Sequence, residues 1–403
     1  MSLIVLKFGG TSVGSIKKIK YVAKIIKKHH DKKNKLIVVS SAMSGVTDNL
    51  INKSKQISKN FDKSEYDVLL SSGEQIACAL LAGALLKIEL KSRSWLSWQI
   101  PIITEGDHKS SRIISINKKE ILKYVNSGGI PIITGFQGIS NNKRITTLGR
   151  GGSDATAISI AKFFGADDCF IYTDVSGVFT TDPKLNRKAK KIYKISYEEM
   201  LEMSSLGAKV MSASSVQDAM INDIDVNVRS TFINSNGTII SNNQKTINKN
   251  IITGIAFTKN EAKITLVGVT DRPGVAASIF KPLADNQINV DMVVQNSSVD
   301  SEQTDITFTI MKDDLKSCIK MLKKNNKISY KKIVHDDKVS KVSIIGAGMI
   351  TTPGISYRMF QALAKKKINI LVISTSEIKI SVLINQKNIK VAVKVLHKEF
   401  DLD

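Results

Sequence analysis

The first 245 residues alternate between short apolar runs and longer amphipathic segments. The apolar runs have the length of buried strands and occupy residues 3–6, 36–40, 100–104, 130–134 and 169–173. Apolar residues recur at helical spacing near residues 16–30, 46–59, 73–90, 117–127 and 153–164. Strands that alternate with helices predict an α/β fold, with an open, mostly parallel sheet and helices on both faces. In such sheets ligands bind at the carboxyl ends of the strands.

The pattern changes after residue 235. Residues 235–250 are mostly polar, which indicates a domain boundary near residue 245. Beyond it, residues 264–310 resemble residues 342–384, and the Pro-Gly pair at 273–274 recurs at 353–354. Recurrence at a constant offset indicates an internal repeat. Each copy has the β-α-β-β-α-β order of a ferredoxin-like unit. We expect three domains, residues 1–245, 246–335 and 336–403, of which the last two can intertwine.

Composition narrows the classes of function. The apolar fraction of 42% is ordinary for a globular protein, but the net charge of +23 invites a nucleic-acid-binding interpretation. Only eight of the 59 basic residues are arginine, the residue that most often recognises bases and phosphates. The lysines are scattered in twos and threes. We therefore expect the charge to lie on solvated helix faces, and we expect no nucleic-acid partner.

The cysteines and the apolar segments bear on the compartment. Cys78, Cys169 and Cys318 lie far apart, which indicates free thiols in a reducing cytosol and gives no metal-site spacing. The N-terminus lacks a signal-peptide pattern, and the longest apolar segment, residues 76–86, is too short to span a bilayer. The sequence predicts a cytoplasmic protein with no membrane partner.

Residues 344–349 suggest a dinucleotide motif, but Thr351 replaces its third glycine, so we expect no NAD site.

The first apolar run ends in a lysine and a glycine-rich turn. Residues 7–14 read Lys-Phe-Gly-Gly-Thr-Ser-Val-Gly and precede a predicted helix. Glycines let backbone N–H groups approach an anion, and a helix N-terminus adds partial positive charge. Lys7 would supply a point charge for a polyphosphate. The turn is not a Walker A motif. It is either a phosphate cradle or a tight turn that binds nothing.

Two further motifs follow the same logic. Residues 40–48 follow the second predicted strand, and their small hydroxyl groups either hold an anion or cap a helix through Ser44 or Thr47. Ser-Ser-Gly-Glu at 71–74 is expected to precede a buried helix. Glu74 is then either a helix cap or the partner of a substrate ammonium group.

Residues 146–154, Thr-Thr-Leu-Gly-Arg-Gly-Gly-Ser-Asp, form the most specific motif. Arg150 can hold a carboxylate with two hydrogen bonds, and Gly151 and Gly152 permit close approach of an anion. Asp154 could cap the following helix, orient Lys7, or do both. A purely structural turn would not need the arginine, so we favour a binding role.

The chemistry indicated is phosphoryl transfer. Two acids in residues 172–183 could contact a nucleotide or its Mg²⁺, or they could form Asx turns before Pro183. Lys209 is either a phosphate-binding cation or a solvated side chain. We find no Cys-His or Ser-His-Asp set for acyl transfer. Glycines, cations and acids instead suit a reaction that depends on positioning and charge neutralisation.

These motifs resemble those of the aspartate kinases (aspartokinases) of the amino-acid kinase family, in the monofunctional form with two C-terminal ACT domains. The resemblance covers essentially all 403 residues. The kinase motifs are Lys-Phe-Gly-Gly-Thr-Ser-Val at 7–13, Ser-Gly-Glu at 72–74, Gly-Arg-Gly-Gly-Ser-Asp at 149–154 and Thr-Asp-Val-Ser-Gly-Val-Phe-Thr-Thr-Asp-Pro at 173–183. The ACT motifs are Thr-Asp-Arg-Pro-Gly at 270–274, Asn-Val-Asp-Met-Val-Val-Gln-Asn at 289–296 and Ser-Thr-Ser-Glu-Ile-Lys-Ile-Ser at 374–381.

The resemblance implies that ATP phosphorylates the side-chain carboxylate of L-aspartate to give 4-phospho-L-aspartate. This is the first step of lysine, threonine and methionine biosynthesis. The acceptor carboxylate is already ionised at pH 7 and needs no general base. The barrier lies in bringing two anions together. Mg²⁺ is expected to be bound largely through the phosphates, with no metal-ligating side chains assigned.

The same match implies roles for single residues. Lys7 would contact the transferring phosphoryl group, and Asp154 would orient Lys7. The implied ATP-binding residues are Lys7, Phe8, Gly9, Gly10, Thr173, Asp174, Phe179, Lys184 and Lys209. The implied aspartate-binding residues are Ser41, Thr47, Glu74, Arg150, Gly151, Gly152 and Ser153.

The ACT pair implies feedback inhibition by lysine, threonine or both, and a homo-oligomer, a dimer or tetramer, formed through ACT domains. The implied effector-binding residues are Asp271, Gly274, Ala277, Asn289, Val290, Asp291, Gln295 and Glu377.

Relatives commonly carry a basic residue where this chain has Ser-Ala-Ser-Ser at 212–215. We expect one type of subunit, because no Met between Met220 and Met292 could start a separate ACT subunit. No dehydrogenase is expected after Asp403.

Other functions remain open at this stage. A rival kinase would act on glutamate, carbamate or a nucleotide, but the tandem ACT repeats and the 149–154 motif argue against it. A second rival is a non-catalytic amino-acid sensor. A pure sensor would not need Lys7, Arg150 and Asp154. A third is a nucleic-acid binder, which salt-dependent retention on DNA would reveal.

Overall fold

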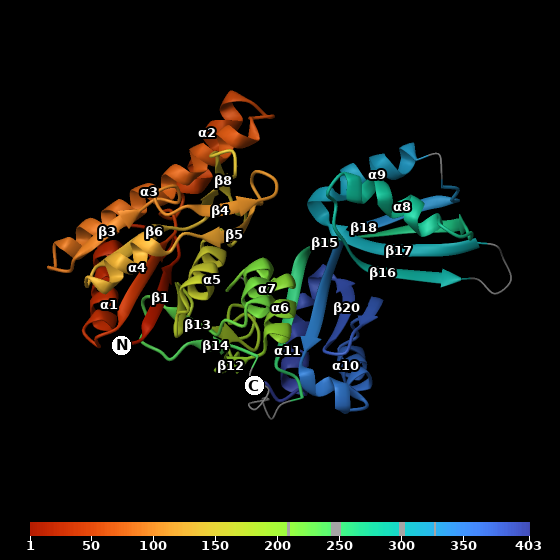
Figure 1. The fold of residues 1–403 in the computed structure, drawn as a ribbon. Coiled ribbons are helices and arrows are strands. Elements are labelled where there is room, and N and C mark those ends of the chain that lie inside the picture. The colour runs from red at the N-terminus through yellow and green to blue at the C-terminus, as the bar shows by residue number, and fades with distance from the viewer. Residues whose placement is uncertain (208–209, 243–250, 298–302, 326–327) are drawn as a thin grey trace. The chain divides into compact units, whose positions relative to one another are not determined.

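The structure is a computed structural model, and it describes residues 1–207, 210–242, 251–297, 303–325 and 328–403 (Figure 1). The chain divides into two compact units. Unit 1 contains residues 1–178 and 191–205 and the described residues from 210 to 242. Unit 2 contains residues 179–190 and 206–207 and the described residues from 251 onward. The boundary expected near residue 245 lies outside the described residues and stays a prediction.

An eight-stranded sheet forms the centre of unit 1, in the order β12-β14-β13-β9-β1-β2-β6-β3. Its strands are β1 (Leu3–Phe8), β2 (Lys35–Ser40), β3 (Ser92–Trp95), β6 (Ile130–Thr134), β9 (Asp168–Thr173), β12 (Lys194–Ile195), β13 (Val226–Ser230) and β14 (Thr238–Ile240). Every neighbouring pair is parallel except β13 and β14. The predicted open, mostly parallel sheet is confirmed.

Helices cover both faces of this sheet. Those of unit 1 are α1 (Ile16–His30), α2 (Val46–Ile57), α3 (Lys63–Leu86), α4 (Lys119–Asn126), α5 (Gly152–Phe164), α6 (Tyr197–Ser205) and α7 (Ala213–Ile221). Successive side chains of a strand point to opposite faces. Leu6 of β1 accordingly packs in one core with α1 and α3, and its neighbour Val5 packs in another with α4 and α5.

Helix α3 is longer than predicted. It begins at Lys63 rather than near residue 73, because the Asp62 side chain accepts the backbone N–H groups of Ser64 and Glu65 and so caps it. By length and composition alone, α3 could cross a bilayer, which corrects the expectation that no segment is long enough. Half of its most apolar stretch is buried inside the protein, and it carries the buried acids Asp67 and Glu74. It is therefore a core helix of unit 1.

A second, four-stranded sheet runs β5-β4-β7-β8. Its strands are β4 (Ile102–Glu105), β5 (Arg112–Ile116), β7 (Gln137–Ile139) and β8 (Ile145–Thr147). The apolar run at 100–104 thus belongs to this sheet and not to the parallel one. Two short strands, β10 (Val178–Phe179) and β11 (Lys191–Ile192), pair separately. All three cysteines are free thiols, as predicted, and all three are buried.

Unit 2 is built on one six-stranded sheet in the order β16-β17-β15-β18-β20-β19. Its strands are β15 (Gly254–Thr270), β16 (Val290–Ser297), β17 (Gln303–Met311), β18 (Lys332–Ile345), β19 (Ile370–Thr375) and β20 (Lys379–Asn385). Its helices are α8 (Val275–Asp285), α9 (Leu315–Lys324), α10 (Ile355–Ala364) and α11 (Ile389–Glu399), with 3-10 turns at Lys312–Asp314, Ala347–Thr351 and Gln386–Asn388.

The long central strands β15 and β18 serve both repeats. One core contains Ile264 of β15 with α8 and α9, and the other contains Ile255 of β15 with α10 and α11. The expected boundary between residues 335 and 336 falls inside β18. The C-terminal helix also holds residues 179–190, since buried His397 shares a 2.8 Å hydrogen bond with the Thr180 hydroxyl.

Candidate active site

The carboxyl ends of three parallel strands lie side by side in unit 1. Phe8 at the end of β1 pairs with Ser40 of β2 and with Tyr172 of β9. The segments that follow these strands therefore emerge at one edge of the sheet. Lys7, the penultimate residue of β1, forms a buried ion pair with Asp154 of α5, with Nζ 2.5 Å from Oδ1. Of the two roles considered for Asp154, orienting Lys7 fits this geometry.

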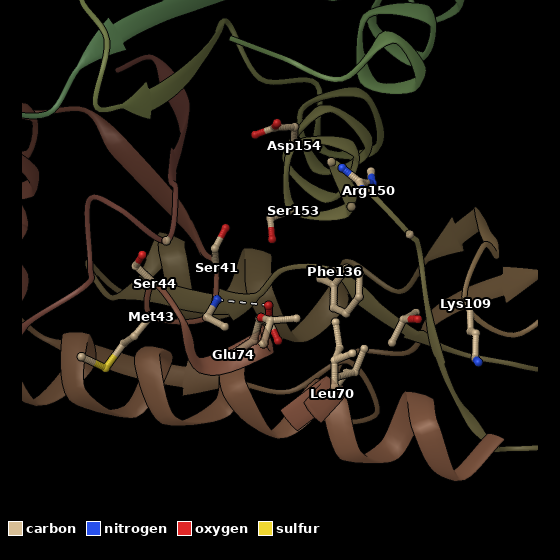
Figure 2. A pocket seen from close by; sticks show the side chains of 18 of the residues that line it. Ser41, Met43, Ser44, Leu70, Glu74, Lys109, Phe136, Arg150, Ser153 and Asp154 are labelled. Atoms are coloured by element: carbon tan, nitrogen blue, oxygen red, sulfur yellow. Dashed lines mark hydrogen bonds between the residues drawn. The ribbon is translucent and has the colours of Figure 1, made fainter. Parts of the chain in front are cut away.

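A pocket of about 570 Å³ opens at this edge (Figure 2). Of the residues expected to bind substrates or catalyse, it is lined by Lys7, Gly10, Ser41, Thr47, Glu74, Arg150, Gly151, Gly152, Ser153 and Asp154. These come from four separate stretches of sequence. Figure 2 shows Glu74 on the α3 side, facing Arg150, Ser153 and Asp154 across the pocket. The fold thus brings the whole expected aspartate-binding set together.

Glu74 is the buried acid of the pocket. It lies in the middle of α3, so the helix-cap alternative for it is wrong. Its Oε1 accepts the Ala42 N–H at 3.0 Å, while its Oε2 has no partner among the described residues. Burial raises the pKa of this carboxyl to about 7, although the hydrogen bond from Ala42 opposes the rise. An ammonium group would supply both the missing donor and the missing charge.

Arg150 lies opposite, in an exposed turn. Its guanidinium forms no ion pair or hydrogen bond within the part of the chain that the structure describes, so its donors are available to an anion. The next residue, Gly151, precedes α5 with φ +75°, and no side chain caps that helix end. A Cβ at Gly151 would collide with the Ser212 hydroxyl. The turn therefore requires glycine, and it leaves the N-terminus of α5 facing the pocket.

The Ser-rich segment at 212–215 supports this turn. Ser212 caps α7, and the Ser215 hydroxyl donates to the Gly151 carbonyl at 3.1 Å. The serines of this stretch therefore support the glycine turn before α5. The sequence alone gave no indication of this contact.

Sequence reasoning missed five pocket residues: Ile51, Tyr66, Leu70, Lys109 and Phe136. Tyr66 and Leu70 precede Glu74 by eight and four residues, the spacing of one helix face. A helix predicted from residue 63 would have revealed them. Lys109 and Phe136 lie in loops that only the tertiary fold brings to the pocket.

Several residues that we expect to bind ATP do not line the pocket or are already engaged in packing and hydrogen bonds. Phe8 is fully buried and stacks on Tyr172, and the Gly9 N–H already donates to the Tyr172 carbonyl. Gly10 is closely packed, because a Cβ there would lie 2.8 Å from the Ala42 carbonyl oxygen. Thr173 donates to Asp174 at 3.1 Å, outside the pocket lining.

Three other ATP-binding candidates cannot be placed at the pocket. Phe179 and Lys184 belong to unit 2, and Lys209 lies outside the described residues. These assignments stay predictions. Within the described ranges, no three His, Cys, Asp or Glu side chains cluster as metal ligands.

The expected effector residues lie on the surface of unit 2. Asp271, Gly274 and Ala277 surround the start of α8, and Gly274 precedes that helix with φ +85°. Four more, Asn289, Val290, Asp291 and Gln295, lie in or beside β16. Glu377 is in the turn between β19 and β20 of the other repeat. Asp291 contacts buried Lys341 of β18, which also lies 3.4 Å from Glu261.

Comparison with known proteins identifies the family of the chain. The profile of the Amino acid kinase family matches residues 2–230, and that of the ACT domain matches residues 264–325 and 342–400. The chain is 44% identical over 405 residues to an aspartate kinase of Pseudomonas putida, covering 100% of this chain and 98% of the relative. It is 42% identical over 402 residues to an aspartokinase of Geobacillus stearothermophilus, with the same coverage. The crystal structure of E. coli aspartokinase III in complex with aspartate and ADP matches with a TM-score of 0.81 and 25% identity, over 99% of this chain and 100% of that one.

Proposed function

The chain belongs to the aspartokinases of the amino acid kinase family, and on this premise we propose that the pocket in unit 1 binds L-aspartate for phosphorylation by ATP. The observation that carries the proposal is the placement of the Lys7–Asp154 ion pair in the same pocket as Glu74 and Arg150. One face of the pocket then holds the acceptor, and the ion pair marks where the phosphoryl group arrives.

The charges of the pocket complement those of L-aspartate. The acceptor carries one ammonium group and two carboxylates. Glu74 Oε2, which is buried and without a hydrogen-bond partner among the described residues, takes the ammonium. Arg150 takes one carboxylate with its paired N–H donors. The second carboxylate is then directed toward Lys7 and reacts there.

Phosphoryl transfer requires that two anions meet. Lys7 neutralises charge on the transferring group, and Asp154 fixes the direction of the Lys7 side chain. Backbone N–H groups at the start of α5, next to Gly151 and Gly152, add positive potential. We expect Mg²⁺ to supply further charge neutralisation through the ATP phosphates.

Unit 2 is proposed to regulate the reaction. Its two ACT repeats bind lysine, threonine or both, at the surface that includes Asp271, Gln295 and Glu377, and inhibit the first step of the pathway to those amino acids. For such control, the effector must bind two states of the protein with unequal affinity. A homo-oligomer formed through the ACT repeats and a cytoplasmic location complete the proposal.

The test is ADP release with ATP, Mg²⁺ and L-aspartate, with hydroxylamine to trap the acyl phosphate. L-glutamate serves as the control acceptor. Lysine and threonine are then added singly and together. Aspartate-dependent turnover that an added amino acid lowers supports both parts of the proposal. Turnover with glutamate but not aspartate refutes the choice of acceptor.

A further inference from the structure

Helix α3 carries a second buried acid, Asp67, two turns before Glu74. Its side chain is completely buried, yet it has no cationic Lys or Arg partner among the described residues. Burying a carboxylate is costly unless hydrogen bonds replace the lost water. Asp67 receives four. Oδ2 accepts the Thr147 N–H at 3.1 Å, the Lys109 N–H at 3.2 Å and His108 Nδ1 at 2.7 Å, and Oδ1 accepts the Thr147 hydroxyl at 2.6 Å.

These hydrogen bonds connect three parts of the pocket wall. Asp67 itself is on α3, beside the lining residues Tyr66 and Leu70. Lys109 belongs to the loop between β4 and β5, and Thr147 ends β8, three residues before Arg150. Lys109, Thr147 and Arg150 all line the pocket. The loop is also tied to β8 directly, because the Ser111 N–H donates to the Thr147 carbonyl at 3.0 Å.

We propose that Asp67 is a positioning residue for the acceptor substrate. By holding β8 and the β4–β5 loop against α3, it fixes the separation of Arg150 from Glu74. An ionised carboxylate only accepts hydrogen bonds, so all four groups must present donors, and His108 must carry a proton on Nδ1. The arrangement has little freedom, since losing one donor leaves charge uncompensated in the interior. The inference rests on the proposed binding of aspartate by Glu74 and Arg150.

Asp67→Asn is the direct test, in the full-length protein. The amide keeps the shape of the side chain, but it places an NH₂ group where the carboxylate accepted hydrogen bonds from Thr147, Lys109 or His108. We expect the KM for aspartate to rise roughly tenfold or more, because small misplacements of binding groups are costly, while the KM for ATP stays within about twofold. Backbone amide hydrogen exchange should become faster at Lys109 and Thr147. Glu199→Gln is the matched control, because Glu199 is a buried acid outside the pocket that accepts hydrogen bonds from Ser196.

Equal rises in both KM values, or an unchanged KM for aspartate despite faster exchange, would overturn the proposal. If Asp67→Asn does not fold, Thr147→Val removes only the hydroxyl donor. It should raise the aspartate KM in the same direction, and no rise would refute the idea. Two further results distinguish failure of the proposed function from failure of this inference. If Glu74→Gln and Arg150→Lys leave the KM for aspartate unchanged, the proposed acceptor site is wrong. If amide exchange at Lys109 and Thr147 is as slow in Asp67→Asn as in the unmodified protein, Asp67 does not hold the β4–β5 loop and β8 in place.

Discussion

Lys7 Nζ lies 2.5 Å from Asp154 Oδ1, and the two side chains are each only 10% exposed. A buried lysine that is held by one carboxylate cannot swing away, so its charge stays where the phosphoryl group is expected. Lys7→Ala should lower kcat roughly 10³-fold or more, which is the scale for removing a charge that stabilises the transition state. Steady-state kinetics with L-aspartate and ATP measure this.

The Lys7 prediction needs a control for folding. Lys7→Ala leaves Asp154 as an unpaired buried charge, which is itself destabilising. The double variant Lys7→Ala/Asp154→Asn removes that charge. It should recover thermal stability without recovering turnover. If turnover returns with stability, Lys7 has a structural role only.

Glu74 predicts a pH dependence for aspartate binding. Its pKa is raised by burial to about 7, so the empty pocket loses this negative charge as the pH falls through about 7. The KM for aspartate should therefore fall as the pH rises from 6 to 8, while aspartate itself stays in one ionic form. Glu74→Gln should raise this KM roughly 30-fold, within the range for one charged hydrogen bond, and remove its pH dependence. An unchanged pH profile in Glu74→Gln would assign the titration to another group.

The fold and the site were predictable to different degrees. Periodicity located four of the eight strands of the parallel sheet, β1, β2, β6 and β9, because a strand buried on both faces is apolar along its whole length. It did not locate β3, β12, β13 and β14, which are shorter or carry polar residues. It misplaced the start of α3 by ten residues, since the helix begins at the polar cap Asp62 and its first turns are mixed in character. Glu74 was therefore expected at a helix end and lies in the middle of the helix. The motifs contained most of the residues that line the pocket, but not those contributed by other parts of helices and by loops. Asp67 gave no local signal, because its partners Lys109 and Thr147 are 42 and 80 residues away.

We predict that a side chain at Gly151, in the turn before α5, lowers activity with aspartate. Gly151 has φ +75°, and a Cβ there would collide with the Ser212 hydroxyl and lie 2.8 Å from that of Ser215. Gly128 has φ +79°, but a Cβ there would meet nothing within 4 Å. Both alanine variants carry the cost of a left-handed backbone, about 1–2 kcal/mol. Only Gly151→Ala should also lose kcat/KM for aspartate, by roughly tenfold or more. Similar kinetics for the two variants would show that the turn tolerates a side chain.

His29 predicts how stability falls in acid. It lies against Phe170 and shares a 2.9 Å hydrogen bond with the Tyr172 hydroxyl. Burial, with Arg229 and Lys32 nearby, lowers the pKa of His29 from 6.5 to about 4. The unfolded chain therefore takes up this proton first, and stability is lost as the pH falls from about 6.5 to 4. His29→Gln should make that loss shallower in thermal unfolding. Equal slopes for both proteins would mean that His29 is not buried in its neutral form.

Asp291 of β16 predicts a separation of inhibition from catalysis. Its side chain is 46% exposed and contacts Lys341, whose own side chain is only 5% exposed and also faces Glu261. Lys341 thus faces two carboxylates, and the more exposed one, Asp291, is free to accept an effector ammonium as well. Asp291→Asn should raise the concentration of lysine or threonine needed for half-inhibition, by roughly tenfold for one lost charged contact. The matched control is Asp285→Asn, which removes an exposed acid on the surface of the same repeat whose ion-pair partner among the described residues is Lys281. Equal inhibition of the two variants would place the effector elsewhere on unit 2.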